Sequence, residues 1–120
     1  MAKKILFVDD EPDVLRVAGF RLKKAEYEVV TAINGQEAWE LVQKIKPDLV
    51  LLDLRLPVMM GDEVCRKIKS DISLNHIPVI LFTASVNNLK DIIKNSGADD
   101  FLTKPFDQEQ LLAKIGKLIG

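Results

Sequence analysis

Along this 120-residue chain, short apolar runs alternate with longer segments in which apolar residues recur at helical spacing. This alternation constrains the fold more than any other feature of the sequence. The five apolar runs cover approximately residues 4–8, 27–32, 48–53, 77–82 and 99–102. Apolar runs separated by helical patterns are typical of repeated βα units, which build a parallel sheet with helices on both faces. The sequence therefore predicts an α/β fold with five strands and five helices.

The order of the strands follows from the handedness of their connections. Crossovers between parallel strands are right-handed, so helices on both faces require the chain to reverse its winding direction once. The simplest result is the flavodoxin-like, doubly wound order 2-1-3-4-5, in which the first and third strands are neighbours. The third and fourth runs are apolar throughout, as central strands should be, while the second is more polar and suits an edge.

Several helix ends are marked in the sequence. Pro12 suits a first helical position. Asn34 and Asp107 are followed three residues later by Glu37 and Gln110, which is the spacing of a capping box. Gly97 suits the end of a helix.

Polar side chains stand at the carboxyl ends of four of the expected strands. They are Asp9 and Asp10 after the first strand, Asp53 at the end of the third, Thr83 after the fourth and Lys104 after the fifth. In an open parallel sheet the ligand crevice lies outside these strand ends, at the point where the winding reverses. We therefore expect three carboxylates, a hydroxyl and an ammonium group to share one pocket.

The chemistry of such a pocket favours phosphoryl transfer. Three carboxylates repel each other, and at least one should have a raised pKa unless a cation is present. Oxygen ligands favour Mg²⁺ or Ca²⁺ over Zn²⁺, and Mg²⁺ is usually held by one or two carboxylates, waters and a phosphate. Lys104 and Thr83 suit the phosphoryl oxygens, so catalysis would consist of positioning and electrostatics. Asp53 is the candidate nucleophile, because a carboxylate can form an acyl phosphate.

Composition excludes several classes of function. The chain carries 17 Lys and Arg against 18 Asp and Glu, a formal net charge of −1 that offers no general attraction to nucleic acid or to an anionic membrane. Its one cysteine, Cys65, cannot form an internal disulfide, which fits a reducing cytoplasm. No apolar segment approaches the roughly 18 residues that a membrane span needs. We expect a single domain over residues 1–120, soluble and cytoplasmic.

The motifs FVDDE, LVLLDLRLP, FTAS and FLTKPF resemble those of the two-component response-regulator receiver domain, as found in chemotaxis response regulators. The resemblance covers essentially the whole chain. It implies that Asp53 accepts a phosphoryl group from a sensor histidine kinase or a phosphotransfer protein. It also implies that Asp10 and Asp53 ligate Mg²⁺ directly, that Asp9 acts mainly through metal-bound water, and that the backbone carbonyl of Arg55 is a further ligand.

The resemblance also implies a switch. Thr83 would bond the phosphoryl group and move toward it, Lys104 would pair with it, and Phe101 on the fifth strand would turn inward. The output surface would be the fourth helix, fifth strand and fifth helix, and it would control binding of an effector protein or output domain, or dimerisation. The protein would catalyse its own phosphorylation and dephosphorylation without being a conventional enzyme. The family also has a cis peptide at the position of Lys104-Pro105.

Two positions near the expected acceptor leave alternatives open. Met60 stands where many receivers have Asp or Asn before the glycine, and it either covers a loop or forms part of a partner surface. Arg55 either lies over the phosphoryl group and shields it from water or contacts only solvent.

Other conspicuous residues have structural interpretations. Cys65 is expected to be a buried thiol, and Trp39 a partial cover of the core. The only histidine, His76, lies in a loop before a strand. Asp99 and Asp100 adjoin the start of the fifth strand, at the opposite edge from the expected site, and are interpreted as turn residues.

Two other functions on related folds are disfavoured. A hydrolase of the haloacid-dehalogenase type needs an Asp-x-Asp at its nucleophile and usually a cap, whereas here the paired acids are adjacent. A flavin or nucleotide binder needs a phosphate loop after the first strand, but the run from Asp9 to Pro12 is acidic and would repel phosphate. Within the receiver class, the sequence leaves open a stand-alone regulator, a phosphorelay intermediate and a receiver cut from a longer protein with an output domain.

Overall fold

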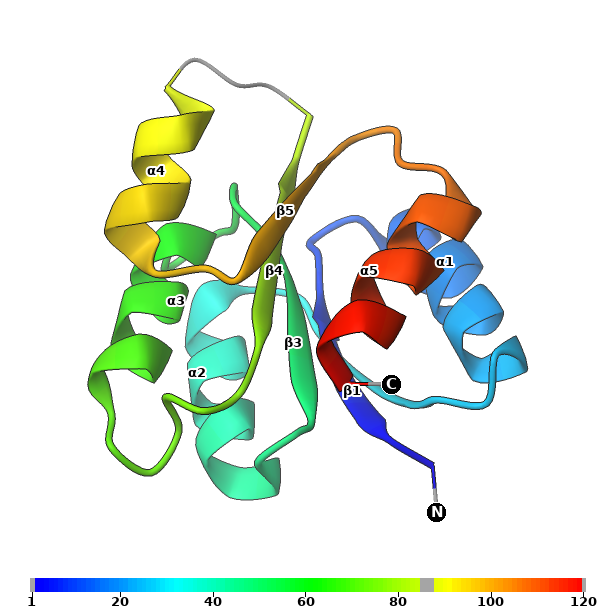
Figure 1. Cartoon of the computed structure of the whole chain (residues 1–120), viewed down its shortest axis with the longest axis horizontal. Helices are drawn as coiled ribbons and strands as arrows, with labels where there is room; N and C mark the ends of the chain where they lie inside the picture. Colours follow the sequence, from blue (N-terminus) through cyan, green and yellow to red (C-terminus); the bar gives the residue numbers. More distant parts are fainter. Residues whose placement is uncertain (1, 85–87, 120) are drawn as a thin grey trace.

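The structure is a computed structural model that describes residues 2–84 and 88–119. A five-stranded parallel sheet in the order β2-β1-β3-β4-β5 lies between two layers of helices (Figure 1). The strands are β1 (Lys4–Val8), β2 (Glu28–Ala32), β3 (Leu49–Asp53), β4 (Val79–Thr83) and β5 (Asp100–Thr103). The helices are α1 (Pro12–Lys24), α2 (Gly35–Ile45), α3 (Gly61–Ser70), α4 (Leu89–Ser96) and α5 (Gln108–Ile119). The expected flavodoxin-like, doubly wound order is confirmed.

The strands lie within two residues of their predicted bounds. β4 begins at Val79 and not at residue 77, because Pro78 has no N–H to give to the sheet and the N–H of Ile77 closes a turn onto the carbonyl of Leu74. At the other end β4 includes Thr83, whose register partner across the sheet is Thr103 of β5. The edge position predicted for the second strand is confirmed.

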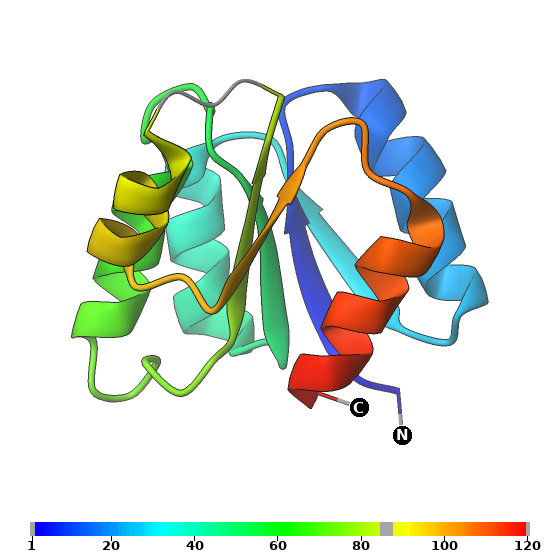
Figure 2. The same ribbon diagram turned by 45° about the horizontal axis from the view of Figure 1, so that its top comes forward.

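Alternate residues of the strands face opposite layers of helices. Leu6 and Val8 of β1 belong to an apolar cluster with residues of α2, α3 and α4, whereas Ile5 and Phe7 belong to a second cluster with residues of α1 and α5. Figures 1 and 2 show these two sets of helices on opposite faces of the sheet. Every residue of β3 and β4 is buried, which explains why their sequences are apolar with no alternation until the last residue.

The predicted helix ends are confirmed. Pro12 is the first residue of α1. The side chain of Asn34 accepts a hydrogen bond of 2.8 Å from the backbone N–H of Glu37, and Asp107 accepts one of 2.7 Å from the N–H of Glu109. Gly97 ends α4 with a φ of 79°, a left-handed conformation that glycine adopts without steric cost.

The structural interpretations of Cys65 and Trp39 are confirmed. Cys65 is fully buried, and burial raises the pKa of its thiol to about 11, so it is protonated at neutral pH. Trp39 is partly buried against the cluster that includes α2 and α3, and the ammonium group of Lys67 lies 5.6 Å from its ring centroid.

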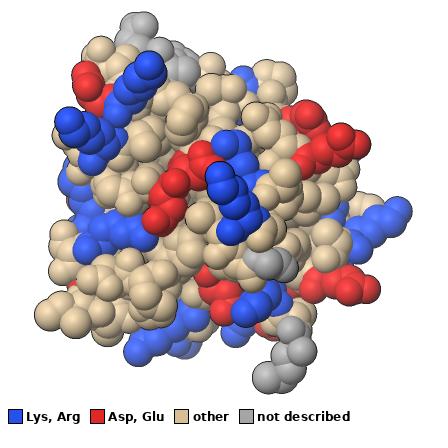
Figure 3. Space-filling model, viewed as in Figure 1, with Lys and Arg blue, Asp and Glu red and all other residues tan. Residues whose placement is uncertain are grey.

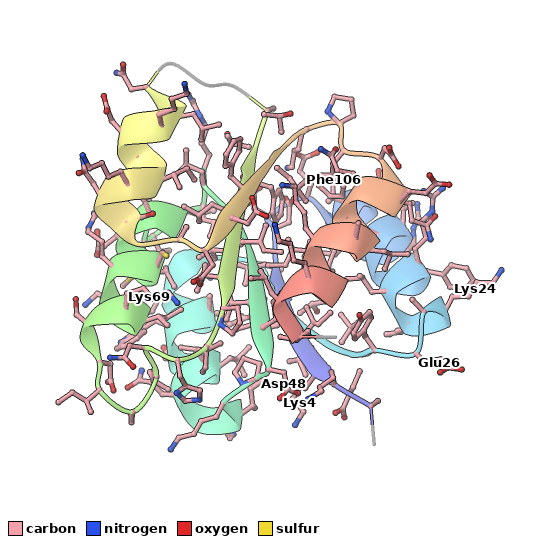
Figure 4. The ribbon with its side chains drawn as sticks, viewed as in Figure 1. Lys4, Lys24, Glu26, Asp48, Lys69 and Phe106 are labelled. Atoms are coloured by element: carbon pink, nitrogen blue, oxygen red, sulfur yellow. The ribbon has the colours of Figure 1, made fainter. Side chains whose placement is uncertain are left out.

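The interpretation of Asp99 and Asp100 as simple turn residues is incomplete. Asp99 lies 2.7 Å from the ammonium group of Lys69, a residue of α3 that is labelled in Figure 4. The same carboxylate accepts a 2.8 Å hydrogen bond from the N–H of Val79, so it joins α3 to the start of β4. Asp100 forms an ion pair of 2.9 Å with Lys114 of α5. Both acids therefore connect elements that are far apart in the sequence.

The surface is mixed in charge. On the face crossed by β5, Lys and Arg side chains lie among Asp and Glu side chains (Figure 3). Among the described helices, none combines the length and the apolar character that crossing a membrane requires.

Two glycines allow the loop after β3 to pack tightly. A Cβ at Gly61, the first residue of α3, would overlap the backbone carbonyl of Asp53. A Cβ at Gly35, the first residue of α2, would overlap the carbonyl of Met59. The loop from residue 54 to residue 60 is therefore pressed against the starts of both helices, and this fixes the backbone at the end of β3.

We predict that Gly61→Ala destabilises the protein by about 1–3 kcal/mol, because the added methyl group must displace the carbonyl of Asp53. Gly116→Ala in α5 is the matched control. A Cβ there meets nothing within 4 Å, and alanine is favoured over glycine inside a helix by roughly 0.5–1 kcal/mol. Urea unfolding of the two variants measures both effects, and equal stabilities would contradict the close approach at Gly61.

Candidate functional site

The acidic cluster lies at the carboxyl ends of two neighbouring strands. Asp9 follows β1, Asp10 comes next, and Asp53 is the last residue of β3. Because β1 and β3 are adjacent in the sheet, one carboxylate oxygen from each of these three residues lies within 4.8 Å of the other two. Asp9 is fully buried and Asp53 is 5% exposed, whereas Asp10 is exposed to solvent. The predicted convergence of the three carboxylates is confirmed.

Lys104 supplies the positive charge at this cluster. Its Nζ lies 2.8 Å from Asp9 Oδ2 and 3.1 Å from Asp53 Oδ2, so one ammonium group bridges the two buried acids. The backbone N–H of Lys104 donates a 2.8 Å hydrogen bond to the carbonyl of Thr83, which continues the pairing of β4 and β5 beyond their last residues. The peptide bond between Lys104 and Pro105 is cis, as the family resemblance implied.

Backbone groups orient the remaining carboxylate oxygens. Asp9 Oδ1 accepts a 2.9 Å hydrogen bond from the N–H of Glu11, and Asp53 Oδ1 accepts one of 3.3 Å from the N–H of Arg55. Each acid thus bonds the chain two residues further on, which is the local turn geometry that aspartate favours. Each buried carboxylate has one oxygen held by its own loop and the other held by Lys104.

Two neighbours of Lys104 were not singled out from the sequence. The Oε1 atom of Glu11 lies 3.6 Å from Lys104 Nζ, and the ring centroid of Phe82 lies 5.1 Å from it. Glu11 was visible as the third acid of the FVDDE motif. The position of Phe82 under the ammonium group depends on the pairing of β4 with β5, which no local pattern encodes.

The protonation of the site follows from burial and from this shared lysine. Burial raises the pKa of the Asp53 carboxyl above its usual value, the hydrogen bond from Lys104 opposes the shift, and the charge of Asp9 adds to it. Burial alone would lower the pKa of the Lys104 ammonium group, but its bonds to Asp9 and Asp53 outweigh this effect and raise that pKa. Lys104 therefore stays charged, whereas ionising Asp53 costs more free energy in the folded protein than in the unfolded chain.

The other predicted site residues lie in two different places. Thr83 is buried at the end of β4, next in the chain to Phe82, which is the register partner of Asp53. Phe101 lies on the edge strand β5 and is 39% exposed, with the ammonium group of Lys114 5.7 Å from its ring centroid. Thr83 therefore ends its strand at the same edge of the sheet as the acidic cluster, whereas Phe101 lies on the exposed side of β5. Ser85 of the FTAS motif lies outside the described residues.

Comparison with known proteins assigns the family. Residues 5–116 match the family model described as the response regulator receiver domain. The chain belongs to this family. It is therefore the receiver domain of a two-component response regulator, as the four sequence motifs indicated.

One curated relative is described as a DNA-binding transcriptional regulator. The receiver domain is 39% identical over 118 residues to the DNA-binding dual master transcriptional regulator RpaA of Synechocystis sp.. The match covers 97% of this chain and 48% of that protein, so the chain spans about half the length of the curated relative.

Solved structures show the same fold. The receiver domain shares 31% identity and a TM-score of 0.91 with the chemotaxis protein CheY4 of Vibrio cholerae, covering 98% of this chain and 99% of that one. It shares 28% identity and a TM-score of 0.92 with the receiver domain of the sensor histidine kinase PA1611 of Pseudomonas aeruginosa, covering 100% and 99% of the two chains. That receiver was crystallised with a magnesium ion coordinated in its active-site cleft.

The donor set of this site fits Mg²⁺. Asp9, Asp10 and Asp53 offer oxygen ligands only, and their oxygens are close enough to share one ion. Three carboxylates against the single charge of Lys104 leave two negative charges, which a divalent cation would neutralise. Asp10 is exposed, so the cluster is open to solvent on that side.

We predict that Asp53→Asn stabilises the protein in buffer without divalent cations, and that the gain depends on pH. The raised pKa of Asp53 means that the folded state holds this proton more tightly than the unfolded state, so ionisation opposes folding. The gain should be full above the raised pKa and should shrink as the pH falls toward 3.8, the value for an unperturbed aspartate. The midpoint of thermal unfolding, compared with the wild type at pH 7 and pH 4, measures this gain. We expect an increase of a few degrees at pH 7. Asp13→Asn, on the exposed surface of α1, is the control and should change little.

Proposed function

We propose that Asp53 accepts a phosphoryl group from a phosphohistidine of a sensor histidine kinase or phosphotransfer protein, in a reaction that requires Mg²⁺. The observation that carries this proposal is the single ammonium group of Lys104 bridging Asp9 and Asp53 at the strand ends. A half-buried lysine shared between acids, beside a third carboxylate, is suited to a ligand that brings both a cation and an anionic group.

In the proposed step, a carboxylate oxygen of Asp53 attacks the phosphorus atom. The O–P bond forms as the N–P bond to the donor imidazole breaks, and the leaving nitrogen keeps the electron pair and then takes a proton. Mg²⁺, held directly by Asp10, Asp53 and the backbone carbonyl of Arg55 and by Asp9 mainly through water, would neutralise charge on the phosphoryl oxygens. Lys104, already beside Asp53, pairs with one of these oxygens. The chain thus catalyses its own phosphorylation, and later attack of water on the acyl phosphate would release inorganic phosphate and restore the Asp53 carboxylate.

Thr83 and Phe101 would transmit the change. The hydroxyl of Thr83 bonds the phosphoryl group, and Phe101 moves inward from its exposed position on β5. The surface formed by α4, β5 and α5 then changes shape and alters binding of an effector protein, an output domain or a second copy of the chain. Phosphorylation would shift the equilibrium between two conformations of the receiver. The size of this shift is limited by how much more favourably the phosphoryl group interacts with one conformation than with the other.

The proposed partner, a sensor kinase, implies where the chain works in the cell. The chain works in the cytoplasm, where sensor kinases present their phosphohistidine. RpaA, twice as long, is described as DNA-binding, and this supports an output region outside the receiver in proteins of that kind. The formal net charge of −1 favours signalling through protein contacts over direct binding of nucleic acid by this chain.

The proposal predicts that acetyl phosphate with Mg²⁺ adds the mass of one phosphoryl group to the wild-type chain. Asp53→Asn should abolish the addition, because the amide is not a nucleophile toward phosphorus. Intact-mass spectrometry measures the product, and the same samples on size-exclusion chromatography report dimerisation. Labelling of the Asp53→Asn variant to the wild-type level would show that the acceptor is another residue.

The proposal also predicts that Mg²⁺ alone stabilises the fold. A ligand at 100 times its Kd adds about 2.7 kcal/mol of stability, which corresponds to a rise in Tm on the order of 10 °C for a domain of this size. Asp10→Asn should remove most of this rise while leaving the metal-free Tm nearly unchanged, because Asp10 is exposed. Asp13→Asn is again the control. An equal Mg²⁺ effect in the wild type and in Asp10→Asn would contradict the assigned ligands.

A further inference from the structure

The two helices that cover one face of the sheet leave a groove between them. In Figures 1 and 2, α1 and α5 lie side by side on the face opposite α2, α3 and α4. The groove has a volume of about 420 Å³ and is open to solvent. This volume is within the range of small-molecule sites, which is roughly 300–1,000 Å³.

The walls of the groove are mostly apolar. They come from α1, from the segment after β5 and from α5, and they include Val14, Val17, Ala18, Phe106, Leu111 and Leu112. Val17 is 49% exposed, so part of this apolar surface faces water. Because removing apolar surface from water is favourable, the groove favours an apolar group as its occupant.

Small residues in the middle of α1 leave room for such a group. Ala18 lines the groove. Its neighbour Gly19 is buried, although a Cβ added there would meet nothing within 4 Å. This part of α1 therefore contributes little side-chain volume, and the two helices do not close over the space between them.

The charged side chains that line the groove differ between its two ends. Glu11, which precedes α1, lies 3.6 Å from Lys104 Nζ, and that ammonium group is already bonded to two carboxylates of the acidic cluster. Arg21 lies in the last turn of α1 and is exposed. Within residues 2–84 and 88–119, its guanidinium group forms no ion pair or side-chain hydrogen bond. With a rise of about 1.5 Å per residue, Arg21 lies about 15 Å from Glu11 along the helix.

We propose that this groove binds a small amphipathic carboxylate, with its apolar chain between α1 and α5 and its carboxylate group beside Arg21. The guanidinium group determines the charge of the ligand's head group, since arginine pairs well with carboxylates. Glu11 would repel a carboxylate at the other end of the groove, which determines the direction of the ligand. The apolar walls determine the character of the rest of the molecule.

The groove also touches the segment that carries Lys104. Pro105 and Phe106 line the groove, and the Phe106 ring packs edge-on against Phe82 with 5.6 Å between the centroids. Phe82 is in turn the ring beside the Lys104 ammonium group. Figure 4 labels Phe106, in the segment between β5 and α5. A ligand in the groove therefore contacts residues that pack against the acidic cluster, but its binding can be measured without phosphorylation and does not depend on the proposed function of Asp53.

The first experiment compares three probes that share an octyl chain and differ in the charge of the head group: octanoate, 1-octanol and octylammonium. Each is titrated into the wild-type chain at pH 7, and the backbone amide signals are followed by NMR. Octanoate should bind about three- to fivefold more tightly than 1-octanol, as expected for a partly exposed ion pair, and octylammonium should bind least tightly. The amides that shift should belong to α1, α5 and residues 104–106. Equal affinities for the three probes, or shifts confined to other elements, would contradict the inference.

Arg21→Gln tests the assigned partner of the carboxylate. It should weaken octanoate binding about three- to fivefold and leave 1-octanol binding within about twofold of the wild type, because only the carboxylate uses the charge. Arg16→Gln is the matched control, since Arg16 also lies on α1 but pairs with Asp13 at 3.1 Å and does not line the groove. An equal loss of octanoate affinity in both variants would mean that only the overall charge matters, and would overturn the site.

Ala18→Leu tests the groove itself. Leucine is a strong helix former, and its larger side chain would occupy the space that the octyl chain needs. All three probes should bind about tenfold more weakly, while the NMR spectrum stays that of a folded protein. Ala113→Leu is the matched control, because Ala113 is exposed on α5 and does not line the groove. Unchanged binding in a folded Ala18→Leu variant would place the probes elsewhere and overturn the inference; if this variant does not fold, the result for Arg21→Gln decides.

The remaining results count against the proposal. Absence of binding by all three probes would overturn it. Self-association of the wild-type chain that Ala18→Leu abolishes, measured by size-exclusion chromatography, would assign the groove to a second copy of the chain and not to a small carboxylate.

Discussion

The sharing of one lysine between two buried aspartates is the interaction on which the site depends. Asp9 and Asp53 come from β1 and β3, and Lys104 follows β5, so their contact exists only when the sheet has its full order. Burying a carboxylate without a partner is costly, and here each buried acid is paired and also held by a backbone N–H. The ammonium group balances only part of the negative charge of the three carboxylates.

The fold supports this charge balance with rigid backbone. Asp53 ends a strand in which every residue is buried, and Gly61 presses the start of α3 against its carbonyl. Every buried side-chain nitrogen and oxygen in residues 2–84 and 88–119 has a hydrogen-bond partner. The described interior therefore contains no unpaired polar side-chain atom that would favour a rearrangement. A carboxylate with a raised pKa can be kept in place because the elements around it are packed and fully bonded.

The loop after Asp53 combines two different requirements. Its glycine contacts favour folding, whereas Val58 opposes it through a positive φ and an exposed apolar side chain. In most of the chain, the conformation that the local sequence favours agrees with the tertiary structure. Examples are the helix that begins at Pro12 and the helix cap at Asn34. Among the described residues, Glu26, Lys46 and Asn88 also have positive φ, but Val58 alone combines it with a β-branched side chain.

Much of the fold and of the site could be predicted from the sequence, because periodicity and composition are local properties. Alternating apolar runs determined the βα units, the winding rule determined the order of the strands, and polar residues at strand ends determined that Asp9, Asp10, Asp53, Thr83 and Lys104 would gather. These inferences need only the position of each residue within its own element, together with the rule that parallel strands end at one edge of a sheet.

Only the tertiary structure determined how these groups share their charges. That Lys104 bridges Asp9 and Asp53, with Phe82 beneath its ammonium group, depends on side-chain directions across three strands. The strained turn at Val58 and the ion pairs of Asp99 and Asp100 likewise arise from contacts between loops and helices distant in sequence. A residue's own neighbours along the chain set its preferences, but its charge state and strain are set by the groups that folding brings within a few ångströms of it.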